Sequence, residues 1–272
     1  MKKHISTIIL IFVFIVGLSL LLYPTVSDFW NSLHQSKAIA TYIEQVADMD
    51  DDKYQKMLQD AYLHNASLLD REIPYVLEPK QKTNYYILLN PGELGIMAYV
   101  EVPSIGVSLP IYHGTDESVL QKAIGHLEWT SLPVGGESTH CVISGHRGLP
   151  SSRLFTDLDK LREGDLFYIR VLDELLTYEV ARILTVEPHE VQSLNIEEGK
   201  DLCTLVTCTP YGVNSHRLLV IGERTENPEE APTVHITADA MQIEPIIVAP
   251  VVAIPLLLIL LTALLISTRK RR

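Results

Sequence analysis

The sequence predicts a mainly β protein: a closed barrel of seven or eight strands with short helices, an N-terminal helical segment and a transmembrane helix at each end. Two observations favour this fold. From Leu94 onward, short β-branched and apolar runs are separated by turn residues at a spacing typical of barrels rather than of parallel sheets. Both ends of the chain contain an uncharged apolar run long enough to span a membrane. We therefore expect a barrel domain over residues 92–224, between the two terminal apolar runs.

The N-terminal segment, residues 1–23, is predicted to be a membrane anchor. Ile5–Leu22 carries no acidic or basic side chain and follows Lys2 and Lys3, a pattern shared by signal-peptide cores and membrane anchors. Leu20–Pro24 lacks the small residues of a signal-peptide cleavage site. An uncleaved anchor is therefore favoured over a removed signal.

Residues 24–69 are predicted to form an extracellular helical segment. Apolar residues recur there near helical spacing, and the acidic run Asp48–Asp52 interrupts them, so we expect two helices. Residues 70–91 contain three prolines and little periodicity, which predicts an irregular segment that serves as a linker or a lid.

Residues 92–224 are expected to contain seven clear strands and two short helices, separated by turn residues. The expected strands are Gly95–Val102, Val107–Tyr112, His140–Ser144, Asp165–Val171, Leu176–Val186, Leu202–Cys208 and Leu218–Gly222, and the expected helices are Glu117–Ile124 and Leu154–Leu161.

The C-terminal part continues with residues 225–245, a Pro- and Glu-rich stretch expected to be an exposed spacer. Residues 246–272 are predicted to be a second transmembrane helix with a basic tail, Arg269–Arg272. Positive residues favour the cytoplasmic side, and they flank both apolar runs on their outer sides. We therefore expect a two-pass protein of the cell membrane, with cytoplasmic termini and an extracellular barrel.

Charge and composition exclude several function classes. The chain has 22 basic and 34 acidic residues, and six of the basic ones lie at the two expected cytoplasmic ends. The expected extracellular part is therefore strongly acidic and repels nucleic acid, so no nucleic-acid partner is expected. No CxxC or His-rich spacing is present, so neither a metal nor another cofactor is expected.

Three cysteines, Cys141, Cys203 and Cys208, cannot all be paired within the chain, so at least one thiol stays free. Cys141 and Cys203 lie inside apolar runs, where small buried core residues are expected. A disulfide between these two remains an alternative if their strands are neighbours.

Cys208 carries the strongest functional signal. It ends the apolar run Thr204–Cys208, which proline and glycine then terminate. The chain resumes at His216–Gly222, a strand expected to pair back antiparallel and to bring Arg217 toward Cys208. A third candidate, His146, follows another apolar run. We predict that these three side chains form one active site.

These residue types suit acyl transfer through a cysteine. A free thiol has a pKa of about 8.5, so a nearby positive group is needed to form the thiolate at neutral pH. A histidine, with an ordinary pKa of about 6.5, can protonate a leaving amine. An arginine keeps its proton and offers several donors to a carbonyl oxygen that becomes negative.

The TLxTC run that ends at Cys208, the Gly-His-Arg of Gly145–Arg147 and the downstream Arg217 resemble the sortases, cysteine transpeptidases of Gram-positive cell surfaces. The resemblance covers about residues 94–224. Ser144–Pro150 and the stretch from Cys208 to Arg217 are most similar to class C, the pilin-polymerising sortases.

That resemblance implies a sortase-like β-barrel in which Cys208 is the nucleophile that forms a thioester, His146 the general acid and base, and Arg217 the stabiliser of the oxyanion and substrate. It also implies cleavage of an LPxTG-like sorting signal between Thr and Gly, followed by transfer to a lysine amine of a pilin subunit. The implied partners are pilins or surface proteins that carry such signals.

Three other functions are weighed against this one. A housekeeping-type sortase would anchor surface proteins to cell-wall peptidoglycan, and a secreted cysteine peptidase would release its product to water. A noncatalytic surface assembly module on the same barrel would tolerate loss of the thiol. The presence of Cys208, His146 and Arg217 argues against the last of these.

Other polar residues near the site are given lesser roles. His140 and His216 flank the site in sequence, but His216 is expected to point away from the face that carries Arg217. Thr207 is a candidate substrate-binding residue, although a threonine in a strand is usually only a strand former. His113 and His126 are expected in loops.

Class C sortases commonly cover the cysteine with a lid that carries an aspartate-proline-aromatic motif, and this chain contains no Asp-Pro dipeptide. Asp70 and Tyr75 supply an acid and an aromatic residue at a suitable position. A divergent lid and a simple linker both stay open for residues 70–91.

Overall fold

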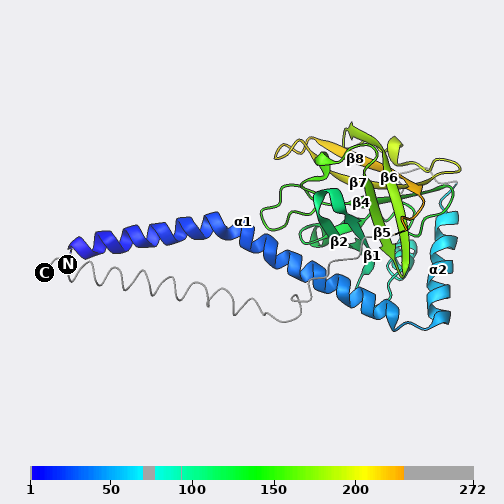
Figure 1. Ribbon diagram of the computed structural model, residues 1–272, viewed down its shortest axis with the longest axis horizontal. Coiled ribbons are helices and arrows are strands. Elements are labelled where there is room, and N and C mark those ends of the chain that lie inside the picture. Colours follow the sequence, from blue (N-terminus) through cyan, green and yellow to red (C-terminus); the bar gives the residue numbers. More distant parts are fainter. Residues whose placement is uncertain (1, 70–76, 93, 230–272) are drawn as a thin grey trace. The chain divides into compact units, whose positions relative to one another are not determined.

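The computed structural model describes residues 2–69, 77–92 and 94–229, and within them eight strands close into a barrel (Figure 1). The predicted mainly β barrel is therefore confirmed. The strands are β1 (Ile96–Val102), β2 (Val107–His113), β3 (Ile124–His126), β4 (Thr139–Ser144), β5 (Leu166–Val171), β6 (Glu174–Val186), β7 (Asp201–Thr209) and β8 (His216–Thr225).

The strand order around the barrel is β1-β2-β3-β4-β7-β8-β6-β5. Two of its pairs are parallel, β2 with β3 and β4 with β7. Parallel strands end at the same edge of a sheet, and Ser144 of β4 lies beside Val206 of β7. The residues that follow β4 therefore meet the end of β7.

Alternation along β7 separates the barrel interior from an outer apolar layer. Cys203 and Leu205 belong to the main core, whereas Leu202 and Val206 pack in a second cluster with residues of β8 and of the segment before β7. Because successive side chains of a strand point to opposite faces, Thr207 faces inward and Cys208 outward. The nucleophile candidate thus lies on the outer face of the barrel edge.

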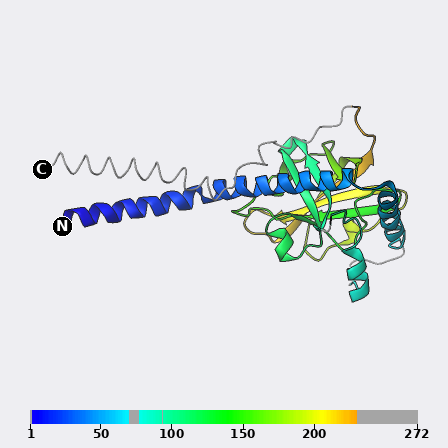
Figure 2. The same cartoon turned by 90° about the horizontal axis from the view of Figure 1, so that it is seen from below.

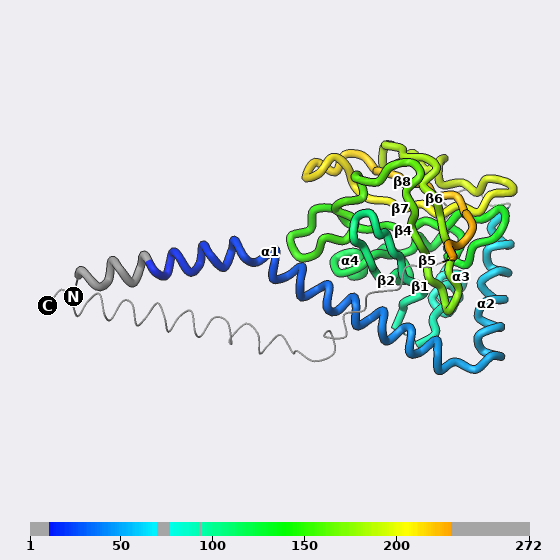
Figure 3. Tube along the Cα trace, in the orientation of Figure 1, coloured from blue at the N-terminus to red at the C-terminus, as the bar shows by residue number. Residues whose placement is uncertain are grey.

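Two helices precede the barrel, α1 (Lys2–Ala47) and α2 (Asp51–Ala66). The break between them falls in the predicted acidic run, where the Asp50 side chain accepts a hydrogen bond of 2.8 Å from the Lys53 amide and caps α2. α1 passes beside β1 and β2, and Figures 1 and 2 show this from two directions. Figure 3 follows the chain from the end of α1 into α2, which stands beside the barrel.

α1 is the one helix in the described part of the chain that is long and apolar enough to cross a membrane, judged by length and composition. Large apolar side chains such as Phe12, Leu20 and Leu21 are exposed on it. The structure therefore agrees with an N-terminal membrane anchor, and α1 continues through Pro24 without ending there.

Several local predictions were wrong. Residues 77–91 are not wholly irregular, because α3 (Pro79–Tyr85) begins with a proline in its first turn and a capping box between Glu78 and Gln81. The expected helix from Glu117 is short, α4 (Glu117–Leu120), because the chain enters β3 at Ile124. The expected helix at Leu154–Leu161 is only a 3-10 turn, Leu158–Lys160.

Some predictions fall outside the described residues. These are the second transmembrane helix in residues 246–272, the end of the spacer before it, and the lid candidates Asp70 and Tyr75.

Candidate active site

The predicted hairpin that carries Cys208 and Arg217 is present. β7 and β8 pair antiparallel, and Cys208 lies directly opposite Arg217. The turn between the strands is closed by hydrogen bonds from the amides of Val213 and Asn214 to the Pro210 carbonyl, of 3.1 and 2.9 Å. Directly opposite residues of an antiparallel pair share a face. The thiol and the guanidinium are therefore on the same side of the sheet.

The Arg217 guanidinium is held by the backbone of the same turn. Its Nη1 donates to the carbonyls of Asn214 at 3.3 Å and His216 at 3.1 Å. A guanidinium has five N–H donors, and both of these hydrogen bonds come from Nη1. The geometry orients the group while Nε and Nη2 can serve a substrate oxygen beside Cys208.

His146 is delivered to the same edge by β4. The Gly145 amide donates a hydrogen bond of 3.0 Å to the Val206 carbonyl, and this bond continues the β4–β7 pairing past the end of β4. The Phe155 amide donates a hydrogen bond of 3.2 Å to the His146 carbonyl, so the loop after His146 folds back onto this residue. His146 is thereby held one strand away from Cys208.

Glu117 of α4 also belongs to this region, and sequence reasoning missed it. Its carboxylate lies 3.8 Å from His146 Nε2, and it is well exposed. No motif in the sequence marks Glu117, because its proximity to His146 arises only when α4 and β4 pack around the barrel.

Thr207 connects β7 to the residue that follows β4. Its side chain is 1% exposed, and its hydroxyl donates a hydrogen bond of 2.8 Å to the Gly145 carbonyl. In this structure the hydroxyl is thus engaged by the backbone residue that precedes His146.

Arg147 contacts two residues that follow Cys208 in the chain. Its Nη1 is 3.5 Å from the Thr209 hydroxyl, and its guanidinium carbon is 5.7 Å from the centre of the Tyr211 ring. It also pairs with Asp159, so its charge is neutralised by a neighbour. Arg147 therefore joins the loop after β4 to the β7–β8 turn.

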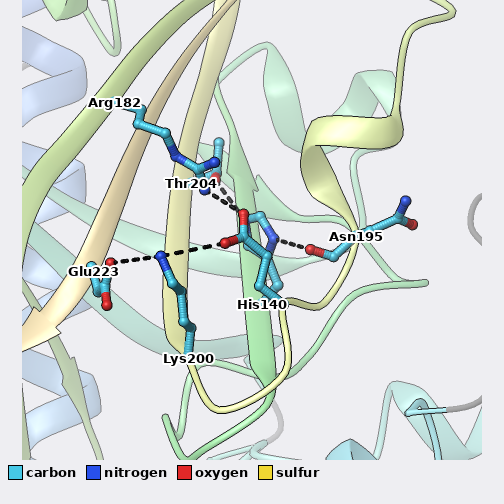
Figure 4. Close-up of polar contacts among 7 residues, drawn as sticks. His140, Arg182, Asn195, Lys200, Thr204 and Glu223 are labelled. Atoms are coloured by element: carbon cyan, nitrogen blue, oxygen red, sulfur yellow. Dashed lines mark hydrogen bonds and ion pairs between the residues drawn. The ribbon is translucent and has the colours of Figure 1, made fainter.

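His140 is excluded from the site by its surroundings. Its ring is 1% exposed, Nδ1 is 2.8 Å from the Asn195 carbonyl, and Nε2 is 2.6 Å from the Thr204 hydroxyl (Figure 4). Burial lowers the pKa of His140, which keeps the ring neutral. His140 is a buried structural residue under the segment that precedes β7.

His113 and His126 are not loop residues. They lie in β2 and β3, 3% and 0% exposed, and their ring nitrogens contact backbone carbonyls and the Tyr85 hydroxyl. The loop prediction failed because hydrogen bonding satisfies these rings inside the barrel wall.

Cys141 and Cys203 are cross-strand neighbours on β4 and β7, and both are buried free thiols. Burial raises the pKa of Cys203 well above its ordinary value. Cys208 differs because it is partly exposed. Within the described residues, no group of three His, Cys, Asp or Glu side chains could hold a metal ion.

A partly exposed cysteine opposite an arginine, with a histidine just past the end of the neighbouring strand β4, supplies the groups that a cysteine transpeptidase needs. The family model for the sortase domain matches residues 100–225. Sortase C1 from Streptococcus agalactiae is 48% identical, with a TM-score of 0.69, over 71% of this chain and 100% of that chain. The chain belongs to the sortase family.

Two further relatives agree with this assignment. Sortase C of Streptococcus pneumoniae is 42% identical, with a TM-score of 0.62, over 72% of this chain and 100% of that chain. Sortase D of Bacillus subtilis (strain 168) is 29% identical over 128 residues, which are 46% of this chain and 62% of that protein. The chain thus matches less than two thirds of the length of sortase D.

Proposed function

We propose that this protein is a pilin-polymerising sortase. It cleaves an LPxTG-like signal between Thr and Gly through a thioester on Cys208 and transfers the acyl group to a lysine amine of a pilin subunit. The register that sets Cys208 opposite Arg217 carries the catalytic part of this proposal. The pilin part is supported by the similarity to sortases C. The structure of one of these, from S. pneumoniae, is described as giving insight into pilin substrate specificity.

In the first half of the reaction, the Cys208 thiolate attacks the threonine carbonyl carbon. Arg217 donates hydrogen bonds to the oxygen that becomes negative, from the same face of the hairpin. The bond from carbon to the glycine nitrogen then breaks, and His146 gives its proton to the leaving amine. The product is a thioester between threonine and Cys208.

In the second half, a lysine amine attacks the thioester carbon. His146, now neutral, takes the proton that the amine loses, and the Cys208 thiolate leaves. The protonated histidine and the Cys208 thiolate are both restored, so the cycle balances without another reactant. An isopeptide bond joins the two subunits.

The proposal extends to topology. α1 anchors the protein, and the barrel faces the cell exterior as in a sortase; the apolar run in residues 246–272 supplies a second span, which leaves both termini in the cytoplasm. Protease treatment of intact protoplasts tests this topology. A barrel that is protected from the protease would contradict it.

The decisive experiment is intact mass spectrometry of the full chain in detergent, incubated with an LPxTG-type peptide. We expect an adduct of the peptide without its glycine end, absent from the Cys208→Ala variant. If the unaltered chain shows no adduct while its Cys208 still reacts with iodoacetamide, this substrate class is wrong.

The acceptor is tested by competition once the adduct is formed. A pilin-derived lysine peptide and an oligoglycine amine, which mimics a peptidoglycan cross-bridge, are offered at equal concentration. Faster transfer to the lysine supports pilin polymerisation. Faster transfer to the glycine amine supports the wall-anchoring alternative, and loss to water alone supports a peptidase.

A further inference from the structure

The part of α1 that follows its exposed apolar stretch makes polar contacts with the loop after His146. The Asp28 carboxylate accepts a hydrogen bond of 2.7 Å from the Arg153 amide. The Asn31 side chain donates to the Ser151 carbonyl at 2.6 Å. With Gln35, these residues have the i, i+3, i+7 spacing of one helix face. We call Asp28, Asn31 and Gln35 the α1 clamp.

Gln35 contacts two segments at once. Its side-chain nitrogen donates to the Lys122 carbonyl at 3.0 Å and lies 3.4 Å from the Ser152 hydroxyl. Gln35 is only 9% exposed, and a buried amide is costly unless it is hydrogen-bonded. These contacts are therefore specific rather than incidental to a surface side chain.

Both segments lead directly to His146. Residues 151–153 lie in the loop that returns to His146, where the Phe155 amide bonds the His146 carbonyl and Phe155 itself is fully buried. Lys122 follows α4, which carries the Glu117 carboxylate that faces His146. The α1 clamp thus holds the two segments that flank the histidine.

The apolar packing of α1 is separate from the clamp. Ile39 and Tyr42 pack against Ile96 and Tyr99 of β1, farther along the helix. Loss of that packing would loosen α1 from the barrel wall without removing a contact to the loop after His146. The two regions of α1 can therefore be tested independently.

We propose that the α1 clamp positions His146 for catalysis, so that the helix suited to anchor the enzyme in the membrane also sets the geometry of its active site. Asp28, Asn31 and Gln35 are positioning residues, because they act through the loop and α4 and not on the substrate. The turnover part of this inference rests on the proposed function, whereas the thiol-reactivity part does not.

The test uses the full chain in detergent, with the triple variant Asp28→Ala, Asn31→Leu, Gln35→Met. The first readout is the rate of Cys208 alkylation by iodoacetamide between pH 5 and 9. Cys141 and Cys203 are buried and give little background. Within the described residues, the charged groups near Cys208 and His146 include Arg217 of β8, Arg147 with its partner Asp159, and Glu117 of α4, and the variant leaves them unchanged.

We expect the rate of Cys208 alkylation to fall about tenfold, because the displaced histidine no longer assists formation of the thiolate. With an LPxTG-type peptide, kcat should fall about tenfold while KM changes little, as for loss of an acid that acts in the transition state.

Two controls separate positioning from general stability. Ile39→Ala should lower the melting temperature and leave the alkylation rate and kcat unchanged. Asp28→Asn keeps an oxygen acceptor for the Arg153 amide, so it should behave like the unaltered chain where Asp28→Ala does not.

An unchanged alkylation rate in the folded triple variant overturns the inference, and so does an equal decrease in Ile39→Ala. If the unaltered chain does not turn over the peptide but alkylation is still slower in the triple variant, the substrate proposal fails and the positioning role stands.

Discussion

The hydroxyl of Thr207 donates a hydrogen bond of 2.8 Å to the carbonyl of Gly145. Each of these residues immediately precedes a catalytic candidate, Thr207 before Cys208 and Gly145 before His146. One buried bond therefore couples the backbone positions of the candidate nucleophile and the candidate acid across the parallel β4–β7 pair.

Removal of that bond should reduce catalysis more than its energy suggests. Thr207→Val keeps the shape of the side chain but leaves the buried Gly145 carbonyl without its partner, which costs about 1–3 kcal/mol. We expect a lower kcat together with a lower melting temperature, measured by peptide turnover and thermal unfolding. Thr207→Ser retains the hydroxyl and should preserve activity, so a Ser variant as impaired as Val would contradict this role.

Gly145 should not tolerate a side chain. A Cβ placed there would lie 2.7 Å from Ile124 Cγ2 and 2.8 Å from Phe155 Cδ2, and Phe155 is fully buried. Gly145→Ala should therefore destabilise the fold by about 1–3 kcal/mol and displace His146. Chemical denaturation and peptide turnover measure the two effects. Gly17→Ala, which meets nothing within 4 Å, is the matched control and should have neither effect.

Thiol titration should distinguish Cys208 from the other cysteines. In the native protein we expect one rapidly reacting thiol, because Cys141 and Cys203 are buried and burial raises the pKa of Cys203. After unfolding in guanidinium without reductant, all three thiols should react. A single reactive thiol in the unfolded protein would show instead that Cys141 and Cys203 form a disulfide.

Stability should decline in mild acid because of His140. The neutral ring donates from Nδ1 to the Asn195 carbonyl and accepts at Nε2 from the Thr204 hydroxyl, while burial lowers its pKa. Below about pH 6.5 the His140 ring binds a proton more readily in the unfolded state than in the folded state. The free energy of unfolding therefore decreases as the pH is lowered, by at most about 1.4 kcal/mol per pH unit.

Urea denaturation between pH 7.5 and 5 measures this slope. His140→Gln should make the slope shallower, even if it lowers stability at every pH. His189→Gln removes an exposed histidine and should leave the slope unchanged. Equal slopes for the unaltered chain and His140→Gln would assign the acid sensitivity to other groups.

The parts of the site that could be predicted from the sequence are those formed by residues close together in the chain. Proline and glycine after Cys208 mark a turn, and the two apolar runs around it are long enough to pair, so the hairpin with Arg217 followed from neighbouring residues. The three prolines of residues 70–91 favour an irregular segment, but one of them, Pro79, lies in the first turn of α3, where a proline favours a helix.

The missed features depend on contacts between distant segments. β3 is three residues long and exists because it pairs with β2 on one side and β4 on the other. Glu117 approaches His146, and Gln35 approaches Ser152, only after the barrel has closed. No periodicity or spacing in a single sequence encodes such proximity.

The strand order of the barrel also determines when the enzyme can become active during its synthesis. β4 must wait for β7, because β5 and β6 come between them in the chain but not between them in the sheet. A chain that has emerged only through β6 has its histidine but neither the thiol nor the arginine. By the proposed mechanism, activity therefore begins only once β8 is in place, and a newly made molecule is inert toward its substrates until its barrel is complete.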